Sequence, residues 1–111
     1  MSDSTSNELM LTRIVRVITE AAQPERIILF GSRARGAARE DSDYDLLVIV
    51  RGAPNERQIS RRIYRALLAH EVNAAVDVIV VQAEKLEQHR DSPYYVYRQA
   101  LREGEIAYEQ N

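Results

Sequence analysis

The sequence lacks cysteine altogether, and Lys85 is the single lysine among its 15 basic residues. Without cysteine the chain has no disulfide, no thiolate zinc site and no cysteine nucleophile. This absence fits a reducing compartment, and we predict a cytoplasmic protein. The remaining basic residues are arginines, whose planar forks suit phosphate and carboxylate recognition, although a codon bias would produce the same skew.

Long apolar runs are also absent. No stretch approaches the roughly 20 residues of a membrane-spanning helix, and the N-terminus has no basic segment followed by an apolar one. We therefore expect neither secretion nor membrane insertion. The net charge of −2 gives no reason to expect direct binding to nucleic acid. With 111 residues, of which 45% are apolar and 29% charged, residues 1–111 are expected to form one globular domain.

Hydrophobic periodicity and turn residues predict an alternation of helices and strands. Thr5 and Glu8 have the spacing of a capping box at the start of the first helix. Asn55 is a candidate N-cap for the second, and Ser92-Pro93 for the last. The predicted helices span residues 5–22, 56–70, 83–89 and 93–104, and the predicted strands span 26–30, 44–50, 74–81 and 105–109. The connection 33–40 is expected to form one or two irregular helical turns.

The lengths of the connections predict how these strands pair. Strands 26–30 and 44–50 are too close in sequence for a crossover helix, so we expect them to be antiparallel neighbours. A helix separates strand 44–50 from strand 74–81, which permits a parallel, right-handed crossover. The predicted fold class is α/β (α+β), with a small mixed sheet of three to four strands flanked by helices.

Three aspartates at alternate positions run into a strand that should be buried. In "EDSDYDLLVIV", residues 40–50, Asp41, Asp43 and Asp45 project to one side because a strand has a period of two. Asp41 is expected to be the solvated entry to the strand. Asp43 and Asp45 can converge, so they must be protonated, paired with arginine, or neutralised by a cation.

A fourth aspartate interrupts the strand at 74–81. Asp77 lies between two valines, where an isolated ionised carboxylate is unfavourable. If this strand lies beside strand 44–50, Asp77 can face Asp43 and Asp45, and such hard oxygen ligands suit Mg²⁺ or Mn²⁺. A lone D-x-D pair is more often a solvated turn. An EF-hand is excluded, because Leu46 and Gly52 occupy positions that require glycine and glutamate.

A Gly-Ser turn follows the first predicted strand directly. Gly31 permits a backbone bend whose amides, together with the hydroxyl of Ser32, can approach a phosphate closely. Arg33 and Arg35 add positive charge nearby. The dipeptide alone is weak evidence, and the turn is not a P-loop, because the G-x-x-x-x-G-K-[ST] pattern is absent.

The turn and the carboxylates together form the pattern G-S-x10-D-x-D, with Asp77 downstream. This pattern resembles the nucleotidyltransferase superfamily that includes polymerase beta. The stretch "FGSRARGAAREDSDYDLLVIV", residues 30–50, is similar to the minimal nucleotidyltransferase (MNT) family. These are prokaryotic single-domain proteins that are often paired with HEPN-domain partners in toxin–antitoxin operons. The order of elements extends the resemblance over nearly the whole chain, including the ending "SPYYVYRQALREGEIAYE".

The resemblance implies a metal site made of aspartates. Asp43 and Asp45 would ligate Mg²⁺, with two ions expected. Asp77 would be the third ligand and would help to activate the acceptor hydroxyl.

The resemblance also implies a nucleotide site beside the metal. Gly31 and Ser32 would hold the triphosphate of the nucleotide. One of Arg33 and Arg35 would contact a phosphate or a partner, and the other would face solvent.

The implied activity is Mg²⁺-dependent transfer of AMP from ATP to a hydroxyl, which makes the protein an adenylyltransferase. Antibiotic-modifying relatives carry an additional helical domain that this chain lacks, so a protein acceptor is favoured. A tyrosine of a HEPN toxin is the acceptor that the resemblance suggests, and the protein would then be an antitoxin. Two alternatives stay open: a non-catalytic antitoxin that covers its partner, and a metal-dependent phosphodiesterase or nuclease. The nucleotide, the acceptor residue and the number of units transferred are left open.

Overall fold

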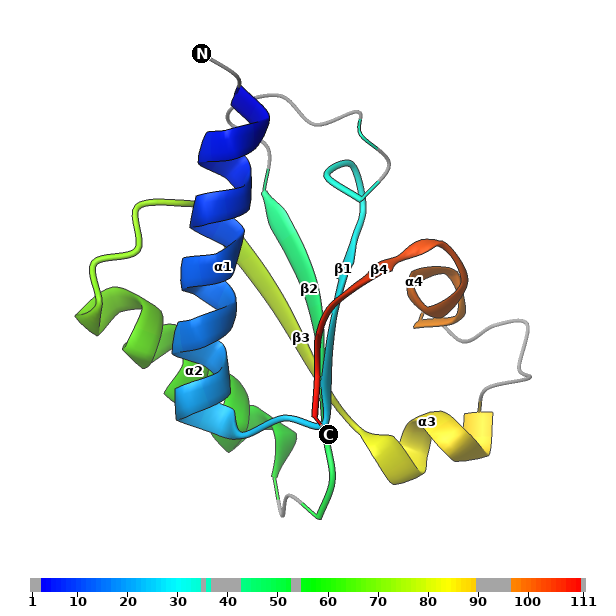
Figure 1. Ribbon diagram of the computed structural model, residues 1–111. Helices are drawn as coiled ribbons and strands as arrows, with labels where there is room; N and C mark the ends of the chain where they lie inside the picture. The colour runs from blue at the N-terminus through cyan, green and yellow to red at the C-terminus, as the bar shows by residue number, and fades with distance from the viewer. Residues whose placement is uncertain (1–2, 35, 37–42, 53–54, 90–96, 111) are drawn as a thin grey trace.

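A four-stranded sheet lies between two pairs of helices, with α1 and α2 on one face and α3 and α4 on the other (Figure 1). The computed structural model describes residues 3–34, 36, 43–52, 55–89 and 97–110. Its elements in chain order are α1 (Asp3–Ala22), β1 (Arg26–Phe30), β2 (Tyr44–Val50), α2 (Glu56–Ala69), β3 (Val76–Gln82), α3 (Ala83–His89), α4 (Tyr97–Glu103) and β4 (Glu105–Glu109). Across the described residues, no helix has the length and apolar composition needed to cross a membrane.

The strand order in the sheet is β3-β2-β1-β4. β1 is antiparallel to β2, and β2 is parallel to β3, as the connection lengths predict. β4 pairs antiparallel with β1, so β3 and β4 are the two edge strands. The predicted fold class is therefore confirmed.

β2 is covered on both faces because its successive residues belong to two different cores. Leu46 and Val48 pack with α1 and α2, whereas Leu47 and Ile49 pack on the side of α3 and α4. Leu46, Leu47 and Val48 are fully buried. Since side chains alternate along a strand, Asp45 projects to the same face as Leu47, which is the face of α3 and α4.

Some predicted boundaries are wrong by one or two residues. α1 begins at Asp3, so Thr5 lies inside the helix and is not its N-cap. α2 ends at Ala69. β3 begins at Val76 instead of residue 74, although Tyr44 N–H still donates to Ala75 O at 2.9 Å. Alanine has low strand propensity, which explains the shorter ladder.

Two predictions fall wholly or largely outside the described residues. One is the Ser92-Pro93 start of the last helix. The other is the helical character of 33–40, of which Arg33, Ala34 and Gly36 are described and lie in a turn.

The start of α2 is fixed by the N-cap that the sequence predicts. The side-chain oxygen of Asn55 accepts from the backbone N–H of Arg57 at 2.9 Å and of Gln58 at 3.2 Å. Asn55 itself is extended, with φ −155° and ψ 112°, as an N-cap residue should be. These bonds satisfy two of the four amides that a helix leaves unpaired at its start.

Replacing Asn55 with Ala should lower the free energy of unfolding by about 1 kcal/mol, because both amides lose their acceptor. Urea denaturation measures the change. Asn55→Asp is the control, because aspartate caps helices about as well as asparagine, and it should leave the midpoint nearly unchanged. Equal losses in the two variants would show that the cap contributes nothing.

Candidate active site

The Gly-Ser turn and the aspartate strand meet at one end of the sheet. Gly31 follows β1 directly and has a φ of +75°, a conformation that favours glycine. A Cβ placed on Gly31 would collide with Oδ2 of Asp45. The missing side chain therefore allows the carboxylate of Asp45 to lie against the backbone of the turn.

Asp45 is also aligned with an aspartate on the neighbouring strand. In the sheet register it lies opposite Phe30 of β1 and opposite Asp77 of β3. Paired residues on adjacent strands project to the same face, and the strands are about 4.8 Å apart. Both carboxylates therefore project on the α3/α4 face, at the end where β2 and β3 begin, uppermost in Figure 1.

Asp77 differs from the prediction in its surroundings. The sequence predicts a carboxylate desolvated within a strand, but Asp77 is exposed. It is the second residue of β3, and β3 is an edge strand, so solvent reaches the side chain. Desolvation therefore does not force Asp77 to bind a cation.

Asp43 lies immediately before β2 and is exposed. Among the described residues, no three aspartate, glutamate, histidine or cysteine side chains gather into a group that could hold a metal ion. The sheet register thus aligns Asp45 with Asp77, without a three-carboxylate group among the described residues. Asp41 lies outside the described residues.

Two carboxylates at this end of the sheet have no partner among the described residues. Neither Asp43 nor Asp77 makes an ion pair or a hydrogen bond within the described part of the chain. A divalent cation fits such a donor set, since carboxylate oxygens are hard ligands. Mg²⁺ in particular is usually held by one or two carboxylates together with substrate phosphates and waters, without a preformed protein cage.

Ser32 and Arg33 continue the turn. Ser32 is partly exposed, and its hydroxyl makes no hydrogen bond to another described residue. The guanidinium carbon of Arg33 lies 3.9 Å from the centroid of the Tyr44 ring, which is a cation–π contact. Tyr44 is buried in the core beneath α1 and α2, so this contact lies on the opposite face from Asp45. Arg35 lies outside the described residues.

The sequence analysis missed the role of Tyr44. Its ring is 3% exposed and supports the arginine that follows the Gly-Ser turn. The available signal was an aromatic residue between two aspartates at the start of a strand.

Comparison with known proteins decides the family. Residues 12–111 match the sequence profile of the family described as "Polymerase beta, Nucleotidyltransferase". The chain belongs to this family. The superfamily resemblance that G-S-x10-D-x-D indicates is therefore confirmed.

Solved structures share the nucleotidyltransferase fold. A crystal structure of a toxin–antitoxin with AMP-PNP has a TM-score of 0.64 at 18% identity, covering 91% of this chain and 74% of that one. A Sulfolobus solfataricus protein assigned as a nucleotidyltransferase has a TM-score of 0.62 at 22% identity, covering 93% and 80%. A mutant of the toxin–antitoxin MntA-HpeT has a TM-score of 0.62 at 15% identity, covering 91% and 74%. No curated protein sequence matches the chain.

Proposed function

We propose that this nucleotidyltransferase-family protein transfers AMP from ATP to a hydroxyl of a partner protein, with Mg²⁺ as cofactor. The observation that carries the proposal is the contact between Gly31 and Asp45. A triphosphate bound by the turn would lie within reach of a metal held by the carboxylates. Such a contact serves a transfer reaction, which needs the donor phosphates and the metal at one place.

Each residue has a stated role in this proposal. Gly31 and Ser32 hold the triphosphate, and Asp43 and Asp45 ligate the metal. The bound metal would neutralise phosphate charge and lower the pKa of the acceptor hydroxyl. Asp77 is exposed, which suits a group that must meet an incoming acceptor.

The transfer step follows from this arrangement. The acceptor oxygen attacks the α-phosphorus of ATP, the bond between that phosphorus and the bridging oxygen breaks, and pyrophosphate leaves. Asp77 accepts the hydroxyl proton. Arg33 or Arg35 contacts a phosphate or the partner, and in the structure Arg33 is held by the ring of Tyr44.

The acceptor in this proposal is a tyrosine of a HEPN-family toxin, so the protein acts as a cytoplasmic antitoxin. Two of the similar structures are toxin–antitoxin assemblies, which supports a toxin partner. One of them was solved with AMP-PNP, an analogue of ATP, which supports ATP as the donor.

Labelled ATP tests the reaction. The purified protein is incubated with Mg²⁺, its toxin partner and ATP labelled on either the α- or the γ-phosphate. Label from the α-phosphate should appear on the toxin, and label from the γ-phosphate should leave as pyrophosphate. Transfer of γ-label would indicate a kinase. Free phosphate or cleaved RNA without labelled toxin would favour a phosphodiesterase or nuclease.

A non-catalytic antitoxin is the second candidate, and it is supported by the two similar toxin–antitoxin structures, because an antitoxin can also act by covering its partner. Co-expression in bacteria separates the two. The double variant Asp43→Asn, Asp45→Asn should fail to rescue growth from the toxin while still binding it in a pull-down. Full rescue by this variant would show that covering the partner is sufficient.

A further inference from the structure

The outward side of α2 carries a row of arginines with apolar neighbours, which we call the α2 stripe. Ile59, Ile63 and Leu67 are buried and face the sheet. On a helix of 3.6 residues per turn, the positions opposite them belong to one outward row. The α2 stripe consists of Arg57, Arg61, Tyr64, Arg65 and Leu68, all of them exposed.

The arginines of the stripe repel one another. Arg57, Arg61 and Arg65 are spaced i, i+4 and i+8, and like charges at this spacing destabilise a helix. None of them forms an ion pair with another described residue. Glu56, the one acidic residue of α2, lies 3.8 Å from Lys85 instead. No described residue of the chain therefore neutralises the positive charge of the stripe by an ion pair.

Two apolar side chains accompany this charge. Leu68 is 81% exposed and Tyr64 is 41% exposed. The hydroxyl of Tyr64 accepts a hydrogen bond from the Val78 backbone N–H at 2.8 Å, which fixes the ring beside the edge strand β3. A fixed aromatic side chain next to arginines resembles the anchors of protein interfaces, where Tyr and Arg are enriched and Lys is depleted.

We propose that the α2 stripe docks an acidic helix of a partner protein, with carboxylates on the arginines and apolar side chains on Leu68 and Tyr64. Charge complementarity identifies the occupant, because three cations in one row, without an ion-pair partner among the described residues, match a row of carboxylates. A protein is favoured over nucleic acid for two reasons. The exposed apolar side chain of Leu68 would gain nothing from contact with a phosphate backbone, and the whole chain has a net charge of −2.

The stripe lies apart from the candidate active site. α2 covers one face of the sheet, whereas Asp45 projects on the face of α3 and α4. A partner held on the stripe leaves the carboxylates uncovered. The inference thus goes beyond the proposed transfer and holds whether or not the aspartates are catalytic.

A designed peptide tests the docking. The probe is an alanine-based helical peptide of about 20 residues, long enough to be helical, with glutamates in an i, i+4, i+8 row and two leucines beside them. Fluorescence anisotropy measures its binding to the full chain. The variant Arg61→Glu, Arg65→Glu should weaken binding at least about tenfold, because attraction becomes repulsion.

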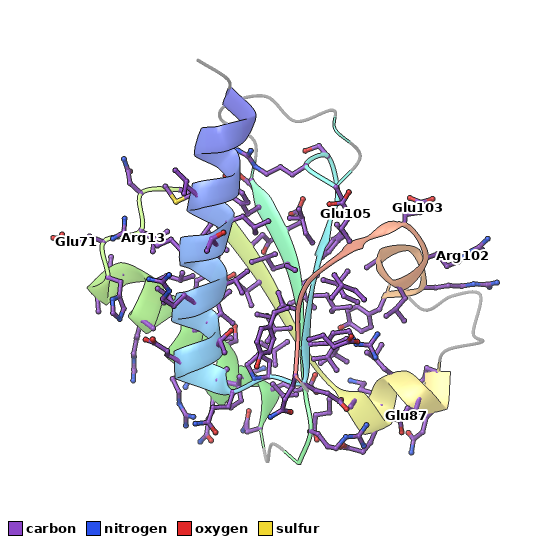
Figure 2. All side chains as sticks on the ribbon, in the orientation of Figure 1. Arg13, Glu71, Glu87, Arg102, Glu103 and Glu105 are labelled. Carbon is purple, nitrogen blue, oxygen red and sulfur yellow. The ribbon has the colours of Figure 1, made fainter. Side chains whose placement is uncertain are left out.

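The matched control is Arg16→Glu, Arg102→Glu, which changes the net charge equally. Arg16 is exposed on α1, and Arg102 points away from the sheet on α4 (Figure 2). This control should change binding less than about twofold, as expected for charges outside the contact. A peptide with lysines in place of the glutamates should bind the stripe variant and not the original protein.

Three results would overturn the proposal. The first is no binding of the glutamate peptide to the original protein, and the second is an equal loss in the control. The third is a duplex RNA of about 16 base pairs that binds through the stripe more tightly than the peptide, which would assign the surface to nucleic acid.

Discussion

Replacing Asp45 with asparagine is expected to lower the rate of nucleotidyl transfer at least about 10³-fold. This factor corresponds to a loss of about 4 kcal/mol of transition-state stabilisation, since each 1.36 kcal/mol changes the rate tenfold. Asp45 contacts the Gly31 turn and lies opposite Asp77, so its carboxylate is central to the proposed metal site. The amide has nearly the same shape but no charge, and a metal ion contributes several kcal/mol of charge stabilisation. The initial rate of α-label transfer measures the loss.

The control for this variant is Glu20→Gln. Glu20 is exposed on α1 and belongs to no part of the proposed site, so its amide should leave the rate unchanged. Circular dichroism should show both variants folded. If Asp45→Asn kept more than about a tenth of the original rate, the variant would have lost less than about 1.36 kcal/mol of transition-state stabilisation. That loss is smaller than the several kcal/mol expected from a metal ion. Asp45 could not then be a metal ligand.

Alanine at Gly31 is expected to lower transfer at least about 100-fold, which is the typical effect of displacing a catalytic group by about 1 Å. The new methyl group would occupy the position of Oδ2 of Asp45 and push the carboxylate or the turn away. Steady-state kinetics should show a lower kcat and a higher KM for ATP, because the proposed metal ligand and the proposed phosphate-binding turn both move.

Gly52→Ala is the matched control for backbone strain. Gly52 has a φ of +71°, close to the +75° of Gly31, but no heavy atom of a described residue beyond its chain neighbours would lie within 4 Å of its Cβ. Both variants should lose about 1–2 kcal/mol of stability from the left-handed conformation. Only Gly31→Ala should lose activity. Equal activities of the two variants would mean that the close approach of Gly31 to Asp45 has no functional role.

Much of the fold could be predicted from the sequence. β1 and β2 are apolar runs bounded by turn residues or charges, and their bounds in the structure are those predicted. The short connection between them and the helix between β2 and β3 were enough to predict antiparallel and parallel pairing. The ends of helices and strands were harder to predict. At the start of β3, for example, Ala74 and Ala75 have low strand propensity and give no clear signal of where strand pairing begins.

The candidate site was predictable as a set of residues and less so as a geometry. Spacing indicated that Asp77 could face Asp45, and the register agrees. Its exposure was not predictable, because it depends on β4 joining the sheet beside β1, which leaves β3 at the edge. The stacking of Arg33 on Tyr44 depends on the path of the turn, which composition and periodicity do not determine.

The intact mass of the proposed toxin partner tests the central claim most directly. The toxin is incubated with the protein, ATP and Mg²⁺ and then analysed by mass spectrometry. The proposed function predicts an increase by one or more AMP units, which disappears with Asp45→Asn. A neutralised toxin whose mass is unchanged would contradict nucleotidyl transfer as the mechanism.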